Sequence, residues 1–363
     1  MARSDNSLKK TSFLGKLGAL TRKQFFIPIA ALVLLVLFNL IMDPSFFAIS
    51  LGKNNNGDPV LSGYLITILN NASELVILAI GMTLVTSASG GQDISVGAGI
   101  AIAGSVMLRI LKTGDVNILK IALAFLAACI VSMIFGAFNG VLVSFFKIQP
   151  MVATLILFTA GRSIAAWINN NELPTIKGDL FGYFGNFIPG IPMPTPVFIS
   201  IICVVIIFLV LKFTTLGLYS QSVGINPNSS RLNGINPERV KLITYIILGL
   251  CVAVAGFIKV SRFSTINYSV IAKDIEMDAI LAVALGGNSL GGGKFNMASS
   301  IMGAYVIQFL TTTLFKYKVE SAALPAYKAI VVIILVVFSA PTVRAKMSEL
   351  GKKLSKKTEK EVA

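Results

Sequence analysis

Long apolar segments, repeated along the chain and separated by short polar intervals, are the feature that most constrains its fold. A helix needs roughly 20 mainly apolar residues to cross the hydrocarbon core of a bilayer. Several of these segments are shorter or broken by glycine, which is tolerated where protein or a water-filled cavity covers the backbone. We predict an all-α, polytopic membrane protein with about ten transmembrane helices, at residues 25–42, 72–87, 94–111, 118–138, 151–168, 197–213, 242–260, 278–285, 297–315 and 326–340.

Three segments need a separate interpretation. Residues 60–71 are apolar but too short to cross, so we expect a distinct interfacial or re-entrant helix there. The span at 118–138 is expected to break at Asn139-Gly140. Residues 169–196 contain five prolines, which exclude a long helix and indicate an external segment.

Positive charge is concentrated at the two ends of the chain. The net charge of +15 comes from 31 Lys and Arg against 16 Asp and Glu, an excess that can indicate nucleic-acid binding. Six Lys and Arg lie in residues 1–24 and seven in residues 341–363. Basic residues flanking apolar spans are retained in the cytoplasm. We therefore predict cytoplasmic tails at 1–24 and 341–363, a membrane domain at 25–340 surrounded by lipid, an even number of spans and no nucleic-acid partner.

The residue types needed for several kinds of chemistry are missing. The chain has no histidine, which removes histidine-based catalysis and zinc binding as interpretations. Its three cysteines lie in apolar segments, where a thiol is normally a small buried hydrophobe. We expect neither a metal site nor an enzyme.

The polar interval at 216–241 carries helix signals. Asn226-Pro227 can begin a helix, because asparagine caps free backbone N–H groups and proline is tolerated at the first helical position. Gly234 can end it in the left-handed conformation, and Asn236-Pro237 repeats the start signal. We predict a short helix at 227–233 across a membrane face; an ordinary cytoplasmic loop is the alternative.

Two glycine-rich stretches indicate breaks between helices. The run at 286–294 resembles a phosphate-binding loop, but Asn288 stands where that motif needs glycine and Phe295 where it needs Ser or Thr. We therefore expect no ATP site. The stretch at 89–97 has the same character, which hints at an internal repeat. Its Asp93 can cap the following helix or contribute to a cation site.

Ionisable side chains inside spans often mark a transport pathway. Glu74 is a candidate, although near an interface it can also extend to water. We expect Arg162 to be a buried charge with a structural partner. Asp274, Glu276 and Asp278 are expected to form a solvated face.

Four ordered motifs resemble those of a known family: GMTLV (81–85) with GGQDISVG (90–97), NG (139–140), INPNSSRLNGI (225–235), and DAI (278–280) with GGNSLGGG (286–293). They are similar to the membrane permease subunits of ribose- and galactose-type ABC sugar importers, within the wider binding-protein-dependent family that includes branched-chain amino acid permeases. The family's cytoplasmic coupling loop usually reads Glu-Ala-Ala where this chain has Asn228-Ser229-Ser230. Gln92-Asp93-Ile94 likewise replaces the common Ile-Asp-Leu.

The resemblance implies a permease for a monosaccharide in the plasma or inner membrane, without a cofactor of its own. It implies three partners: an ATP-binding subunit that uses the ATP, an extracellular solute-binding protein, and a second permease copy, identical or related. The residues it assigns to coupling with the ATPase are Asn226, Pro227, Asn228, Arg231, Leu232, Gly234 and Ile235. Polar residues of the spans are expected to line the pathway: Glu74, Thr83, Asp93, Asn139, Thr154 and Asn288.

Other functions stay open at this point. A nucleoside or another small polar solute is the alternative ligand for an importer. An ion-coupled secondary transporter would need deep carboxylates, of which the chain has few. An intramembrane enzyme has weaker support because the chain has neither histidine nor a paired deep carboxylate.

Overall fold

The computed structural model describes residues 25–53 and 57–339, so the two predicted basic tails lie outside the described residues. Its elements, in chain order, are α2 (Phe26–Met42), η1 (Pro44–Phe47), β1 (Ser50–Lys53), β2 (Pro59–Ser62), α3 (Tyr64–Ser89), α4 (Val96–Leu111), α5 (Ile118–Ser144), α6 (Pro150–Ile168), α7 (Asp179–Gly182), α8 (Thr195–Phe213), α9 (Leu216–Ile225), α10 (Pro227–Leu232), α11 (Pro237–Phe263), α12 (Ile275–Leu285), α13 (Met297–Lys316) and α14 (Leu324–Ser339).

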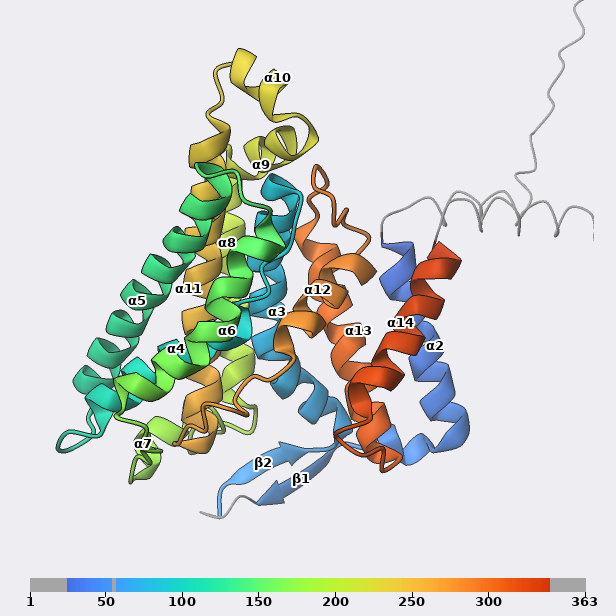
Figure 1. Cartoon of the computed structure of the whole chain (residues 1–363). Coiled ribbons are helices and arrows are strands. Elements are labelled where there is room, and N and C mark those ends of the chain that lie inside the picture. Colours follow the sequence, from blue (N-terminus) through green and yellow to red (C-terminus); the bar gives the residue numbers. More distant parts are fainter. Residues whose placement is uncertain (1–24, 54–56, 340–363) are drawn as a thin grey trace, which may run out of the picture.

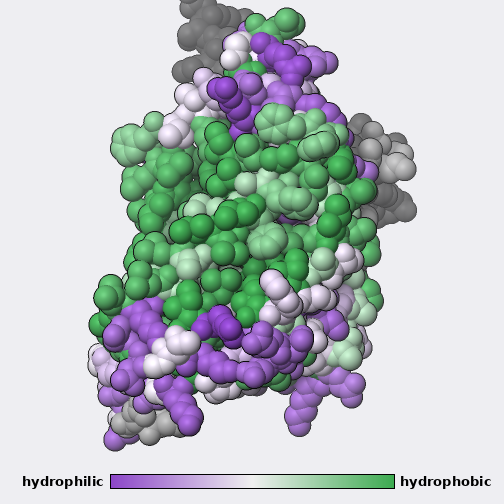
Figure 2. Space-filling model, turned by 60° about the vertical axis from the view of Figure 1, so that its left-hand side comes forward, coloured by the Kyte–Doolittle hydropathy of each residue, from purple (hydrophilic) through white to green (hydrophobic). Residues whose placement is uncertain are grey.

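The helices confirm a polytopic membrane protein. Within the described residues, α3, α5, α6, α8, α11 and α13 are long and apolar enough to cross a bilayer. The apolar parts of α2, α4 and α14 are shorter. Figure 2 shows the matching surface, a broad hydrophobic band between two hydrophilic ends.

Helices α3 and α11 form the centre of the bundle (Figure 1). The apolar windows of α3 and α11 are 72% and 67% buried, whereas that of α8 is only 22% buried. Glycines allow α11 to lie very close to α5: a Cβ on Gly136 would be 2.4 Å from the Tyr245 carbonyl oxygen. Such close approach gives van der Waals packing where lipid supplies no hydrophobic driving force between helices.

The expectation for residues 60–71 was wrong. β2 pairs antiparallel with β1, so the fold is not purely α-helical, and α3 continues unbroken from Tyr64 to Ser89. Gly63 separates strand from helix at φ 142°, where a Cβ would lie 2.5 Å from the Ala48 carbonyl oxygen. The change of structure therefore occurs at a glycine and not inside the apolar run.

The predicted break at Asn139-Gly140 was also wrong, because α5 continues to Ser144. The Asn139 side chain bonds to Asp93 and Ser95, and Gly140 packs against Leu242 of α11. Both residues are thus explained by contacts between helices. The expected breaks before α4 and after α12 are present. α3 ends at Gly90, which has φ 69°, and a glycine-rich loop separates α12 from α13.

Candidate functional site

α10 lies at one tip of the molecule, next to α9 and away from the β1–β2 hairpin (Figure 1). Its start is as predicted: the Asn226 side chain accepts hydrogen bonds from the N–H groups of Asn228 and Ser229, both at 3.0 Å, and Pro227 occupies the first turn. This satisfies two backbone donors that a helix start leaves free.

The end of α10 is also as predicted. Gly234 has φ 79°, and its N–H donates to the Arg231 carbonyl at 3.0 Å. The Ile235 N–H donates to the Ser230 carbonyl at 3.0 Å, which completes a Schellman motif. Asn236 then caps α11 by accepting from the Arg239 N–H at 3.0 Å. The geometry of α10 is therefore fixed by short-range signals.

One carboxylate holds α10 against the rest of the molecule. Glu238 in the first turn of α11 pairs with Arg231 of α10 and, at 2.5 Å, with Lys147 of the α5–α6 turn. Leu232 is not held in this way, and its side chain is 90% exposed. A large apolar side chain at an exposed tip is a candidate anchor for a partner protein.

α9 occupies a region where only a loop was expected. Leu216, Tyr219 and Val223 recur at helical spacing and pack on Ala88 of α3 and Val240 of α11. The C-terminal part of α9 is therefore seated on the helix break that follows α3.

The two glycine-rich breaks and α9 meet at one place. The Gly293 N–H donates to the Ser87 carbonyl at 3.0 Å. The Gln92 side-chain amide donates to the Leu290 carbonyl at 2.8 Å. A Cβ on Gly224 would lie 2.6 Å from the Gly293 nitrogen. Backbones so close transmit any displacement of α9 directly to both breaks.

Three of the predicted pathway residues gather at the break before α4. Asp93 Oδ1 accepts hydrogen bonds from the Ser95 N–H at 2.7 Å and hydroxyl at 2.6 Å. Asn139 donates to Asp93 Oδ2 at 3.3 Å, and the Ile94 N–H donates to Thr154 Oγ1 at 3.2 Å. α4 itself has no side-chain cap. Asp93 thus holds the turn that leads into α4 instead of capping the helix.

Asp93 and Asn139 border a cavity of about 20 Å³, which has room for about one water molecule. Asp93 and Asn139 are 3% and 1% exposed. The polar cluster is therefore buried inside the bundle.

Two more predicted residues share one acceptor. The Thr83 hydroxyl and the Asn288 amide both donate to Ser300 Oγ at 2.7 Å. Asn288 also binds both polar atoms of the Asn296 backbone, which shapes the loop before α13. Thr83 and Asn288 therefore join α3 to the second break.

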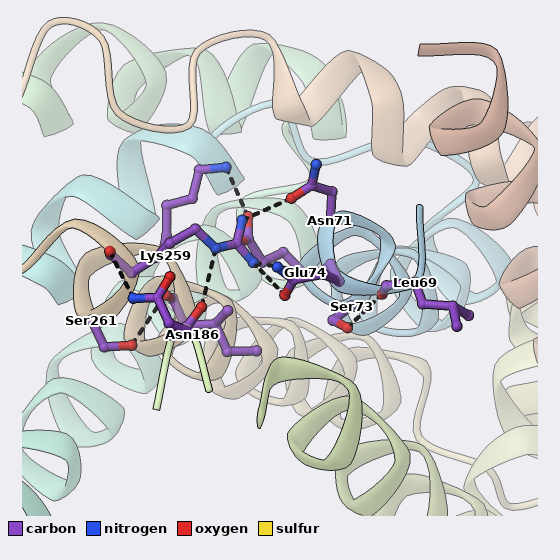
Figure 3. A network of polar contacts seen from close by, with 11 residues as sticks. Leu69, Asn71, Ser73, Glu74, Asn186, Lys259 and Ser261 are labelled. Atoms are coloured by element: carbon purple, nitrogen blue, oxygen red, sulfur yellow. Dashed lines mark hydrogen bonds and ion pairs between the residues drawn. The ribbon is translucent and has the colours of Figure 1, made fainter. Parts of the chain in front are cut away.

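The sixth predicted residue, Glu74, lies apart from the others in a buried network (Figure 3). Its side chain is 2% exposed and forms ion pairs with Lys259 and Arg262 of α11, both at 2.9 Å. Arg262 also donates to the Asn71 side chain at 3.2 Å. Extension of Glu74 to water is therefore excluded in this structure.

Lys259 and Arg262 were not singled out from the sequence. They stand three residues apart at the end of an apolar segment, where basic residues usually indicate an interface. No local pattern in the sequence pairs them with Glu74, which lies in another helix.

The predictions for the remaining charged residues were correct only in part. Arg162 donates to the carbonyls of Tyr268 and Ile271 at 2.7 and 2.8 Å, which confirms a structural partner, but its side chain is half-buried instead of buried. The solvated acidic face was correct for Asp274, which is exposed, but wrong for the other two residues: Glu276 is 3% exposed, and Asp278 is half-buried and pairs with Lys328 at 2.7 Å. Helix α14, which supplies Lys328, covers this side.

Comparison with known proteins agrees with these features. A family model described as the permease component of a branched-chain amino acid transport system matches residues 64–340. The fructose import permease FruF of Bifidobacterium longum is 35% identical over 91% of this chain and 92% of its own length. No solved structure is significantly similar to the chain.

Two Escherichia coli proteins are similarly related. The galactofuranose transporter permease YtfT is 37% identical over 78% of this chain and 80% of its own length. The ribose import permease RbsC is 36% identical over 85% of this chain and 91% of its own length. The chain therefore belongs to the binding-protein-dependent permease family of ABC importers, the family of these sugar-import permeases.

Proposed function

We propose that this permease imports a monosaccharide, delivered by an extracellular binding protein and driven by a separate ATP-binding subunit. The observation that carries the proposal is α10, a capped helix at one tip with Leu232 90% exposed and Arg231 held by Glu238. A rigid helix with an exposed apolar side chain fits insertion into a groove of an ATPase. The sugar-import relatives support the choice of substrate.

The proposal includes an arrangement in the membrane. α10 and both termini lie in the cytoplasm, the β1–β2 hairpin lies outside, and about ten crossings are made when the short helices are counted. The residues assigned to coupling are Asn226, Pro227, Asn228, Arg231, Leu232, Gly234 and Ile235. Two copies of the chain, or one copy and a related permease, enclose the pathway. The chain binds no cofactor and catalyses no reaction, since the ATPase subunit hydrolyses ATP.

An ion-coupled transporter is the second candidate, because Asp93 is buried without a cationic partner among the described residues. Glu74 and Asp278 are less suited to carry an ion, because lysine and arginine already neutralise them. A nucleoside is the alternative importer ligand.

Uptake into proteoliposomes separates these functions. The permease is reconstituted with its ATPase subunit and binding protein, and radiolabelled fructose, galactose, ribose and uridine are offered in turn. We expect uptake of a sugar that requires ATP and persists when ionophores collapse the Na⁺ and H⁺ gradients. Gradient-driven uptake by the permease alone would overturn the proposal, and uptake of uridine alone would overturn the sugar.

A further inference from the structure

We infer that a polar cavity at the end of the bundle opposite α10 is a binding site for an uncharged monosaccharide. This inference rests on the proposed function and gives its substrate a site. The cavity has a volume of about 410 Å³, within the roughly 300–1,000 Å³ of small-molecule sites. Its polar lining comes from four helices and the loop before α12: Asn71 and Glu74, Lys259 and Arg262, Lys273, Asp278, and Gln308.

The position of the cavity follows from the course of α11. This helix begins at Pro237 beside α10 and ends at Phe263, which lines the cavity. Helix α3 begins next to β2, reaches the cavity at Asn71, and ends beside α9 (Figure 1). The cavity therefore lies in the half of the bundle that receives solute from outside in the proposed arrangement.

Both carboxylates of the lining are paired with cationic side chains. Glu74 is paired with Lys259 and Arg262, and Asp278 is paired with Lys328 at 2.7 Å. Lys273 at the rim is exposed, so water and salt screen its charge. A cation entering the cavity would have to compete for these paired carboxylates, whereas an uncharged solute leaves the pairs intact.

The same groups suit a molecule rich in hydroxyl groups. Each sugar hydroxyl both donates and accepts hydrogen bonds, and the amides of Asn71 and Gln308 offer both functions in one side chain. The Lys259 ammonium, paired with Glu74, retains further donor positions, whereas the N–H groups of Arg262 are already used within the protein. Phe263 is 62% exposed and offers an aromatic face to the apolar side of a sugar ring.

A purely structural role would explain the ion pairs but not the space beside them. The Glu74 network alone joins α3 to α11, and a contact made only for stability would be closely packed. Leucine, a substrate type suggested by the name of the family model, carries two charges and an aliphatic side chain. It would leave most of the polar groups of the lining without a partner.

Cysteine protection tests the inference on the full-length permease in proteoliposomes. Cys129, Cys203 and Cys251 are first replaced by alanine. Reporter cysteines are then introduced separately as Gln308→Cys and Lys273→Cys, so that one reporter remains if the other variant fails to fold. Lys53→Cys in β1, exposed and outside the cavity lining, is the matched control.

A membrane-impermeant methanethiosulfonate is applied to the face opposite α10, with fructose, galactose, ribose or leucine present in excess. We expect at least one sugar to slow labelling at positions 308 and 273 by two-fold or more, without an effect at position 53. Leucine is expected to have no effect. Failure of every sugar to protect a reactive reporter, or failure of both reporters to react, would show that the cavity is not a sugar-binding site.

The uptake assay tells this failure from that of the proposed function. If ATP-driven sugar uptake is observed without protection, the proposed binding site is wrong and the import function stands. If leucine protects and is also taken up, both the uncharged ligand of the cavity and the proposed substrate are wrong.

Discussion

Gly224 of α9 lies so close to Ser87 of α3 that a Cβ on Gly224 would be 1.8 Å from the Ser87 carbonyl oxygen. Real Cβ atoms do not approach backbone oxygen so closely, so the contact exists only because residue 224 is glycine. It links the tip that carries α10 to the break between α3 and α4. In the proposed mechanism, motion imposed on α10 reaches the pathway through this contact.

Gly224→Ala should therefore separate α9 from the break. We expect the variant to lose about 1–3 kcal/mol of unfolding free energy through overpacking, and to lose ATP-driven uptake. Gly217→Ala is the matched control in the same helix, since its Cβ would meet only side chains at 3.5 Å or more. Thermal unfolding and proteoliposome uptake measure the two effects. Equal behaviour of the two variants would contradict the proposed contact.

The ion pairs of Glu74 should stabilise the bundle strongly once formed. Glu74→Ala leaves Lys259 and Arg262 without their carboxylate, and removing one partner of a buried pair costs about 3–5 kcal/mol. The control is Glu172→Ala, which removes an exposed pair with Lys112 and should cost far less, because water screens the pair. Chemical unfolding of the purified variants gives both values. A cost for Glu74→Ala as small as the control would show that the network is not buried in the membrane.

Sidedness follows from the basic ends of the chain, because cytoplasmic loops retain Lys and Arg. Asn228→Cys in α10 should react with an impermeant thiol reagent only from the cytoplasm. Leu51→Cys in β1, where the native side chain is 72% exposed, should react only from outside. The background has no other cysteine, as in the protection assay. Reaction of position 228 in intact cells treated from outside would reverse the proposed orientation.

Local signals were sufficient for α10. Asn226, Gly234 and Asn236 each act on backbone groups within three residues, so the sequence predicts the helix without knowledge of its neighbours. The glycine breaks at Gly90 and after Leu285 were predictable for the same reason.

Contacts between distant segments account for what sequence patterns missed. Asn139-Gly140 resembles a helix break, but Asn139 bonds to Asp93, 46 residues away, and the helix continues. Glu74 and Arg262 are separated by most of the chain, and no local pattern shows that they form an ion pair. The apolar character of residues 60–71 did not reveal the pairing of β2 with β1.

The shape of α10 provides another test of coupling. Gly234 has φ 79° with open space around it, so Gly234→Val meets no steric clash but strains the backbone, because a β-branched residue resists the left-handed conformation. We expect a permease that is inserted normally, retains less ATPase on purification and takes up little sugar. Gly234→Asn, which tolerates this conformation better, should retain most uptake. Equal uptake by the two variants would show that the turn after α10 has no role in coupling.

If work from ATP hydrolysis enters the permease through α10, Leu232→Glu should uncouple hydrolysis from uptake. Truncating a buried interface anchor typically costs about 2 kcal/mol or more, and burying a carboxylate in its place should cost at least as much. Leu232→Met keeps the anchor apolar, and Leu173→Glu places the same charge at a residue 56% exposed in the α6–α7 segment. The measurement is ATP-driven uptake in proteoliposomes containing equal amounts of each permease. We expect at least a ten-fold loss of uptake for Leu232→Glu, with both controls close to wild type; wild-type uptake by Leu232→Glu would show that α10 does not transmit work from ATP hydrolysis.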